Sequence, residues 1–558
     1  MSLAGAGARL ERRWALVGAC AAIAAALAAI WLALGPPTPD LAAQVYRADL
    51  FADHGFTAWE NQWFGGHHVL GYSLVFPELG AWIGARSVGA LTAVLEAALF
   101  AWLLSDWDAR RARAPALWFA VGTVGELMIG RITFALGTAI GIAALIALQR
   151  KKTAPAVILG ALCAATSPVA GLFLVMAAAA IALAGSRETH EAVAPLAGSR
   201  ETHEAVAPLA RRRAIRAALA PLAVAAAALA VDVVLAVAFP EGGAEPFSTN
   251  AALVVVAIAV GVYFVVAPQL RVVRYGALLY ALGTVAAYAL PTAMGSNATR
   301  PAALLAGPIV LAAARTRRAI VLAVLVAPLA LYQVWGPVRE VRKGIGDPSV
   351  HAAYYQPVIA FLKAHDDRPA RLEVPFTRAH WESVFLARVI PLARGWEGQL
   401  DVKYDRLFHY GVLTARAYDR WLGQLGVRWV AVPDVPLDPS GTPEAALIAG
   451  GLPFLALRER TRHWAIYEVT DARPLASGPG RLVALGSTSF SIVAYQPGTI
   501  TVKVRFTPYW ALVEGAGCVQ RTADGFTSIR ADHPGPLRVS VHFSFGRIDA
   551  TSPRCRGS

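Results

Sequence analysis

The first 335 residues contain a long series of apolar segments, and this series limits the chain to a small group of folds. The run from Trp14 to Leu34 follows a cluster of arginines and is long enough to cross a bilayer, which takes about 20 apolar residues in a helix. Further segments of this kind lie at 87–105, 115–130, 132–149, 154–167, 168–184, 214–239, 249–268, 275–291, 298–314 and 318–335. The series predicts a polytopic α-helical membrane domain over residues 1–335, with about eleven transmembrane helices.

The composition of the whole chain excludes two other classes of protein. Of its 558 residues, 56% are hydrophobic and 16% are charged. Soluble domains carry about 25% charged residues, so an ordinary cytosolic enzyme is excluded. An intrinsically disordered chain is excluded because it needs low hydrophobicity. Four cysteines in a chain of this length also exclude a disulfide-dense scaffold.

The positions of the basic residues predict how the membrane domain is oriented. Lysines and arginines cluster at 9–13, 110–113, 150–152, 187–216, 271–274 and 315–318, and these clusters alternate with segments that are almost free of them. Because basic loops stay on the cytoplasmic side, the N-terminus is predicted to be cytoplasmic, residues 36–86 to form a first external loop, and everything after about 336 to lie outside. The net charge of +14 therefore mainly sets orientation in this half, and no nucleic-acid partner is expected. The Ala- and Arg-rich composition is typical of a GC-rich bacterial genome, so the expected membrane is a bacterial plasma membrane.

Two stretches of the membrane domain leave details of the topology open. Residues 154–184 fit two short helices that meet at Ser167-Pro168, or one long kinked helix. The sequence GSRETHEAVAPLA occurs at 185–197 and again, unchanged, at 198–210. Two copies are too few for a solenoid, so 185–213 is predicted to be a flexible cytoplasmic loop.

The composition becomes ordinary after about residue 336, where two external domains are predicted. Residues 336–474 alternate between helical and strand patterns, which indicates an α/β domain. The expected helices lie at 352–365, 378–393, 403–425 and 444–450, and the expected strands at 371–376, 427–433 and 463–469. Residues 475–558 show period-2 alternation typical of a β-sandwich. Cys518 and Cys555 lie there in an oxidising environment, so they form either a disulfide or two free thiols.

The first external loop is rich in titratable and aromatic side chains. Residues 40–53 fit an amphipathic helix on the membrane surface, with Asp49 and Asp53 on a shared face. Residues 69–83 contain Pro77 and suit a bent or re-entrant segment. The alternative is an interfacial loop with an aromatic belt. That alternative explains the tryptophans well, but it explains the many titratable groups less well.

These features resemble the GT-C superfamily of integral-membrane glycosyltransferases. The resemblance is carried by Asp40 soon after the first span, by the 40–53 helix, and by Trp63-Phe64-Gly65-Gly66 leading to Gly71-Tyr72 and Pro77. The turns GRITFALG, FPEGGAEPF and MGSNATRPAALLAGP look like external turns of the family, and PGTITVKVRFTPYWALVEG resembles the C-terminal β-domain of YfhO-like members. The resemblance implies an inverting glycosyltransferase that takes a sugar from a polyprenyl-phosphate donor and passes it to a cell-envelope glycan, glycolipid or protein.

Such a transfer needs a general base and cations at the leaving phosphate, which assigns expected roles to particular residues. The expected base is Asp40, with Asp49, Asp53 or Glu60 to support it, to bind sugar or to hold a metal. Arg131 and Arg300 are rare basic residues at membrane depth on the external side, so they are expected, with Arg47, to bind the donor phosphate. Their alternative is contact with lipid headgroups. Sugar or acceptor contacts are expected from His54, Trp63, His67, Trp381, Trp396 and Asp401.

A divalent cation, Mg²⁺ or Mn²⁺, is a further expectation, although the sequence names no ligand set for it. The expected partners are the lipid bilayer, the polyprenyl-phosphate sugar and the acceptor. A transporter or lipid flippase is the rival interpretation, but the hydropathy shows no corresponding halves. A catalytically inactive relative that assists envelope assembly is the third.

Overall fold

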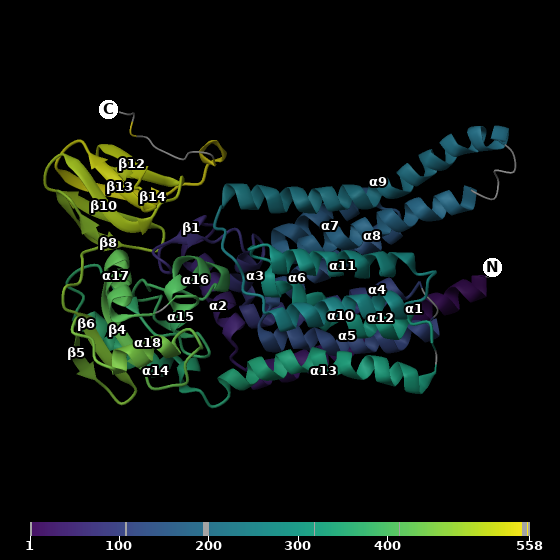
Figure 1. The fold of residues 1–558 in the computed structure, drawn as a ribbon, viewed down its shortest axis with the longest axis horizontal. Coiled ribbons are helices and arrows are strands. Elements are labelled where there is room, and N and C mark those ends of the chain that lie inside the picture. Colours follow the sequence, from purple (N-terminus) through teal and green to yellow (C-terminus); the bar gives the residue numbers. More distant parts are fainter. Residues whose placement is uncertain are drawn as a thin grey trace.

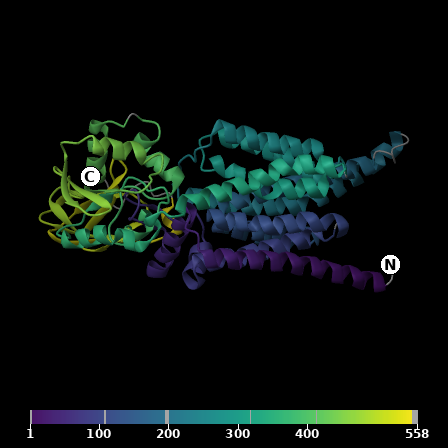
Figure 2. The same ribbon diagram turned by 90° about the horizontal axis from the view of Figure 1, so that it is seen from below.

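A computed structural model describes residues 3–106, 109–193, 200–316, 318–411, 413–548 and Cys555. The chain forms an elongated helical bundle, and two β-containing domains from its C-terminal part are packed against one end of that bundle (Figure 1). We call this the junction end; the turns at 35–84, 130–131, 239–248 and 290–299 lie there. The other end, where the N-terminus lies, is the distal end (Figure 2).

Every predicted apolar segment coincides with a helix of the bundle. These helices are α1 (Leu3–Leu34), α4 (Ala85–Leu104), α5 (Ala109–Ile129), α6 (Ile132–Gln149), α7 (Thr153–Thr166), α8 (Pro168–Val193), α9 (Arg200–Ala238), α10 (Thr249–Val265), α11 (Arg271–Ala289), α12 (Arg300–Ala313) and α13 (Ala319–Gly344). Within the described residues, seven of them are long and apolar enough to cross a membrane: α1, α4, α6, α8, α9, α11 and α13. The chain is thus a multi-pass membrane protein by the length and composition of its helices, whereas the count of about eleven spans stays a prediction.

The stretch 154–184 forms two helices, as predicted. Helix α7 ends at Thr166 and α8 begins at Pro168, with Ser167 between them in an extended conformation. Proline disfavours the helical conformation in the residue before it and fits the first position of a helix, so the break falls where the sequence places it.

Two predictions about the membrane domain differ from the structure. Helix α13 continues to Gly344, so the boundary proposed at residue 335 falls inside a helix. A Cβ atom at Gly344 would lie 2.1 Å from the carbonyl oxygen of Pro37, which shows how closely the end of α13 packs against the segment after α1. The repeat at 185–210 lies partly outside the described residues, but α8 runs to Val193 and α9 begins at Arg200. The described parts are therefore helical instead of forming the expected flexible loop.

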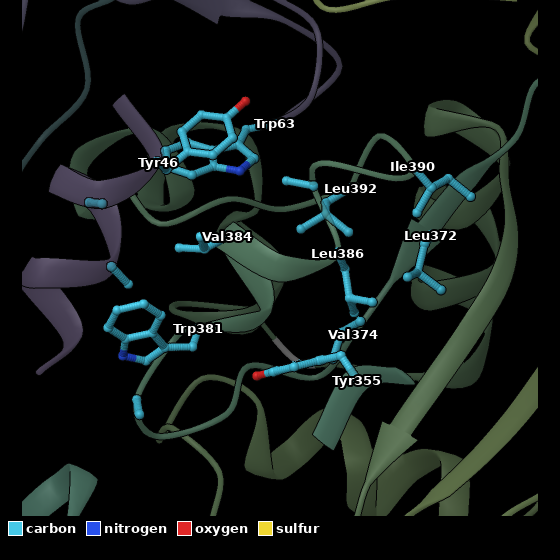
Figure 3. Packing of buried hydrophobic residues seen from close by; sticks show 14 of the residues in the cluster. Tyr46, Trp63, Tyr355, Leu372, Val374, Trp381, Val384, Leu386, Ile390 and Leu392 are labelled. Carbon is cyan, nitrogen blue, oxygen red and sulfur yellow. The ribbon is translucent and has the colours of Figure 1, made fainter. Parts of the chain in front are cut away.

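The first loop contains the predicted surface helix, but the helix is packed against protein. The loop comprises α2 (Pro39–His54), β1 (Trp59–Glu60), β2 (His67–His68) and α3 (Phe76–Ile83). The apolar face of α2, with Leu41 and Tyr46, shares one hydrophobic core with Trp63 and with the C-terminal α/β domain. Figure 3 shows Tyr46 and Trp63 beside Val384, Leu386 and Leu392 of that domain. The loop is thereby fixed at the junction end.

The α/β domain has a four-stranded sheet in the order β3-β4-β6-β5, in which only β3 and β4 are parallel. Its elements are α14 (Ala352–Ala364), β3 (Arg371–Glu373), α15 (Glu382–Phe385), α16 (Gly398–Tyr404), α17 (Ala415–Leu425), β4 (Val427–Pro433), α18 (Thr442–Ala449), β5 (Leu455–Arg460) and β6 (Trp464–Val469). The helix predicted at 378–393 is wrong except for the single turn of α15. His380 has a φ of +58°, which interrupts a helix, and the side chain of Thr377 accepts a 3.1 Å hydrogen bond from the backbone N–H of His380, so the chain forms a turn before α15. The helix predicted at 403–425 is shorter, because Thr414 caps α17 by accepting from the backbone N–H of Ala417.

The last part of the chain is a sandwich of two antiparallel four-stranded sheets, ordered β12-β13-β10-β7 and β11-β14-β9-β8. The strands are β7 (Ala476–Ser477), β8 (Gly480–Leu485), β9 (Ser489–Ala494), β10 (Gly498–Arg505), β11 (Trp510–Glu514), β12 (Gly517–Arg521), β13 (Phe526–Ala531) and β14 (Gly535–Val541). Their inward side chains, among them Phe490, Ile500 and Val539, form one buried core. Cys518 and Cys555 are joined by a disulfide, with their Cα atoms 5.0 Å apart.

Candidate functional site

Asp40 and Arg131 lie side by side at the junction end. Asp40 is in the first turn of α2, and its Oδ2 is 3.6 Å from Nε of Arg131, which precedes α6. The glycine before Arg131 makes this approach possible. Gly130 has a φ of +94°, and a Cβ there would lie 2.4 Å from the backbone N of Leu41. The α5–α6 turn thus rests directly on the backbone that carries Asp40.

Arg300 belongs to the same cluster of charges. It is the first residue of α12, and its guanidinium lies 5.0 Å from the ring centre of Phe134 and donates to Asn297. The charges of Arg131 and Asp40 both act on it. Within the described residues, the buried Nε atoms of both arginines lack a hydrogen-bond partner. Arg131 therefore lies beside the Asp40 carboxylate, and Arg300 lies within electrostatic range of both groups.

Two further carboxylates complete this cluster, and the sequence did not assign them a role. Glu126 on α5 acts electrostatically on both arginines, and one of its buried oxygens has no partner among the described residues. Glu245 lies in the turn after α9 and accepts a 2.8 Å hydrogen bond from Ser296. Burial raises the pKa of Glu245, although that bond and the charge of Arg300 oppose the shift. The placement of Glu245 in a turn that resembles the family was the signal available in the sequence.

The other predicted acids of the first loop lie elsewhere. Asp49 is nine residues after Asp40, and a helix turning about 100° per residue places it on the opposite side of α2. There it pairs with Arg388 of the α/β domain. Asp53 and the neighbouring His54 are exposed at the end of α2. Of the acids on this helix, Asp40 is the one that lies beside Arg131.

Glu60 is a fully buried acceptor that holds the loop together. Its carboxylate accepts from the Tyr46 hydroxyl at 2.7 Å and from the backbone N–H groups of Gln62 and Trp63 at 2.6 and 3.2 Å. It also lies 2.8 Å from Nδ1 of His67. All of these partners belong to the loop itself, so Glu60 stabilises the loop between α2 and α3.

Burial lowers the pKa of the His67 imidazole, but the carboxylates of Glu60 and Glu397 outweigh this effect, so the pKa lies above its usual value. Glu397 comes from the α/β domain and also pairs with Arg47 at 2.5 Å. The Arg47 guanidinium stacks over the ring of Tyr72 at 3.7 Å. Arg47 and His67 thus connect the first loop to the α/β domain, while their predicted contacts with donor or acceptor stay predictions.

The tryptophans predicted to bind sugar are largely enclosed. Trp63 is buried, stacks on Tyr46 with ring centres 4.0 Å apart, and donates from Nε1 to the carbonyl of Ser383 at 3.1 Å. Trp381 is 7% exposed, and Trp396 stacks on His380 with ring centres 3.4 Å apart. Their roles in binding sugar stay predictions.

Asp401 lies in a buried ionic cluster of the α/β domain. Arg394 donates to its two oxygens at 2.9 Å each, and His409 lies 2.6 Å from Oδ2. Burial raises the pKa of Asp401, but Arg394 and His409 lower it by more, so the group stays ionised. Asp401 is therefore already provided with protein partners.

No group of three or more His, Cys, Asp or Glu side chains is arranged to hold a metal ion in the described part of the chain. The expected divalent cation consequently has no ligand cage of protein side chains there, and it stays a prediction.

No family model matches the chain, and no curated protein matches it. Among solved structures, the arabinofuranosyltransferase AftD from Mycobacteria is similar with a TM-score of 0.46 and 14% sequence identity. The match covers 96% of this chain and 57% of that chain, so this chain spans little more than half the length of AftD.

Proposed function

We propose that this chain is a GT-C-like membrane glycosyltransferase that moves a sugar from a polyprenyl-phosphate donor to a cell-envelope acceptor at the junction end. The observation that carries the proposal is the placement of Asp40 beside Arg131 and near Arg300, where the membrane helices meet the C-terminal domains. A lipid-linked donor approaches such a site from the bilayer, and a polar acceptor approaches it from the C-terminal domains.

The two arginines support a phosphate ligand. Guanidinium groups bind phosphate through paired N–H donors and stay charged when buried. A buried donor without a partner costs free energy, so the unpartnered Nε atom of Arg300 favours a ligand that accepts hydrogen bonds. Nε of Arg131 lies 3.6 Å from the Asp40 carboxylate, too far for a hydrogen bond. A phosphate group between the two arginines meets this need.

The proposed reaction is a single displacement with inversion. The acceptor hydroxyl oxygen attacks the anomeric carbon and gives its proton to the Asp40 carboxylate. The bond between that carbon and the phosphate oxygen breaks, and its electron pair leaves with the polyprenyl phosphate. Arg131 and Arg300 stabilise the charge that develops on the phosphate.

The proposal places the reaction on the external face of a bacterial plasma membrane. The basic clusters at 110–113 and 271–274 lie in the first turns of α5 and α11, and that at 150–152 lies in the turn between α6 and α7; all three are at the distal end, which fits a cytoplasmic distal end. A requirement for Mg²⁺ or Mn²⁺ is part of the proposal and is tested by adding EDTA to the assay below. A cation that bridges donor phosphate needs few protein ligands, so the lack of a protein cage is compatible with it.

The test is transfer by the purified chain in proteoliposomes, with a panel of radiolabelled polyprenyl-phosphate monosaccharides and envelope glycans as acceptors. Asp40→Asn is expected to lower the rate by about 10²- to 10⁴-fold, the usual contribution of a general base. Asp419→Asn, at an exposed position of α17, is the matched control and keeps the wild-type rate. Full activity of Asp40→Asn overturns the assignment of the base. Accumulation of label inside sealed vesicles without a covalent product overturns the transferase in favour of a transporter.

A further inference from the structure

A cleft lies between the α/β domain and the β-sandwich, apart from the junction site, and none of the residues of that site lines it. Its volume is about 650 Å³, within the range of about 300–1,000 Å³ typical of ligand pockets. Five segments line it: 362–370 at the end of α14, 389–391, Gly426 with 428–429 of β4, 472–476 and 481–485 of β8. β8 belongs to the β-sandwich and β4 to the α/β domain, so the cleft lies at the seam between the two domains.

The cleft is positively charged. Two acidic residues line it, Asp366 and Asp367. The basic residues that line it are more numerous: Lys363, Arg368, Arg428, Arg473 and Arg481. Arg428 is held in place by Asp367 and by Glu468. In the described part of the chain no carboxylate pairs with the other four, which are exposed: Lys363, Arg368, Arg473 and Arg481. Cations left unpaired around a concave surface attract an anionic ligand.

One wall of the cleft is the free edge of a β-sheet. Among the strands that the structure describes, β8 is the last of its sheet and pairs with β9 alone. Five consecutive residues of β8, 481–485, line the cleft. Alternate side chains of a strand point to opposite faces of the sheet, so a run of consecutive lining residues indicates that the cleft meets the edge of the strand and not one face. The edge therefore offers backbone N–H and C=O groups to a ligand. Val483, whose side chain is 43% exposed, adds an apolar surface beside Pro391 and Pro474.

We infer that this cleft binds an anionic oligosaccharide, one that carries carboxylate or phosphate groups. Guanidinium groups recognise the acids, the strand edge bonds to hydroxyls, and the apolar patch contacts the C–H face of a sugar ring. The same edge offers pairing to an acidic peptide strand. A bulge between Leu482 and Ala484 interrupts the register of β8, however, and a bulge blunts an edge against strand addition. The assignment of this glycan as the acceptor rests on the proposed function; binding in the cleft does not.

The experiment measures binding to the full-length protein in nanodiscs by fluorescence anisotropy, without any donor. The labelled probes are tetragalacturonate, a phosphorylated mannopentaose, neutral maltotetraose and an oligoglutamate peptide. At least one acidic sugar is expected to bind, and the two acidic probes distinguish carboxylate from phosphate recognition. The neutral sugar is expected to bind at least about tenfold more weakly, since each lost charge-assisted hydrogen bond is worth about that factor.

Arg473→Ala and Arg481→Ala are each expected to weaken the acidic sugar by about tenfold. Arg538→Ala is the matched control: Arg538 is exposed on β14 of the same sheet as Arg481 but does not line the cleft. Its affinity is expected to stay at the wild-type value.

The inference is overturned if neither acidic sugar binds, if maltotetraose binds equally well, or if oligoglutamate binds more tightly than both sugars. Equal loss in all three arginine variants also overturns it, because that result indicates non-specific attraction to a basic surface. Because no transfer is measured, an inactive junction site leaves the result of this experiment unaffected.

Discussion

Replacing Gly130 by alanine tests whether the turn between α5 and α6 fixes the position of Asp40. The added Cβ would lie 2.4 Å from the backbone N of Leu41 and 3.0 Å from the carbonyl carbon of Asp40. Both are backbone atoms, so no side-chain rotation relieves the overlap, and α2 must move away from α6. We expect the separation of Asp40 from Arg131 to increase and sugar transfer to fall.

The expected loss of stability has two parts. A non-glycine residue at a φ of +94° costs about 1–2 kcal/mol, and forcing an extra carbon into a packed contact costs about 1–3 kcal/mol more. Gly55→Ala separates them. Gly55 follows the last residue of α2 with a φ of +65°, and an added Cβ there meets nothing within 4 Å. This control carries the backbone cost alone.

The assays are the unfolding midpoint in detergent, hydrogen exchange of the first turn of α2, and the rate of transfer in proteoliposomes. Gly130→Ala is expected to lower the midpoint further than Gly55→Ala, to increase exchange at 40–43, and to reduce transfer at least about tenfold, the effect of about 1.4 kcal/mol on a barrier. Gly55→Ala should leave the exchange and the transfer unchanged. If the two variants match in all three measurements, the close contact does not position Asp40 and the reasoning is refuted.

Three other predictions concern stability. The pKa of His67 is raised on folding, so its contribution to stability is complete below its ordinary pKa and is lost as the pH rises through the raised value. The free energy of unfolding should therefore fall above about pH 6.5, and His67→Gln should remove that pH dependence. Asp401→Asn removes the bidentate partner of buried Arg394, which keeps only Glu444 at 3.5 Å, and should lower the free energy of unfolding by about 3 kcal/mol in urea titrations; an unchanged value contradicts the buried pair. Cys555→Ser removes the disulfide between Cys518 and Cys555, which lie 37 residues apart, and should lower the free energy of unfolding by about 3–4 kcal/mol in the same titration. A loss below about 1 kcal/mol contradicts this loop-entropy argument.

The membrane helices could be predicted because the signal for them is local. A run of apolar residues is long enough or it is not, and Pro168 marks the break between α7 and α8 without any knowledge of the neighbours. The helix at 378–393 failed for the opposite reason. Its pattern is helical, but the backbone of His380 has a φ of +58°, and the backbone N–H groups of Leu392 and Ala393 donate to Gln62 and Leu372 in other parts of the fold.

The candidate site could be predicted in part. The sequence indicated Arg131 as a site residue because basic residues are rare on that side of the membrane, and it indicated Asp40 because this residue follows soon after the first span. Helical geometry alone separates Asp49 from Asp40, since nine residues correspond to half a turn beyond two full turns. Gly130 contacts the start of α2, which lies about 90 residues earlier in the chain. A local sequence pattern cannot predict such a contact, because the two segments meet only in the folded chain.

The position of Asp40 depends on both halves of the chain. On one side, the α5–α6 turn touches the start of α2 through Gly130. On the other side, Arg47 pairs with Glu397 across 350 positions of sequence, and Asp49 pairs with Arg388 across 339. The α/β domain therefore holds the helix that carries the proposed base, and it also encloses the loop core around Trp63 (Figure 3). The Arg47–Glu397 pair is buried, whereas Asp49 and Arg388 are partly exposed, so the loss of Glu397 should perturb α2 more than the loss of Arg388 and should reach Asp40 through this helix instead of through direct contact with the reacting groups.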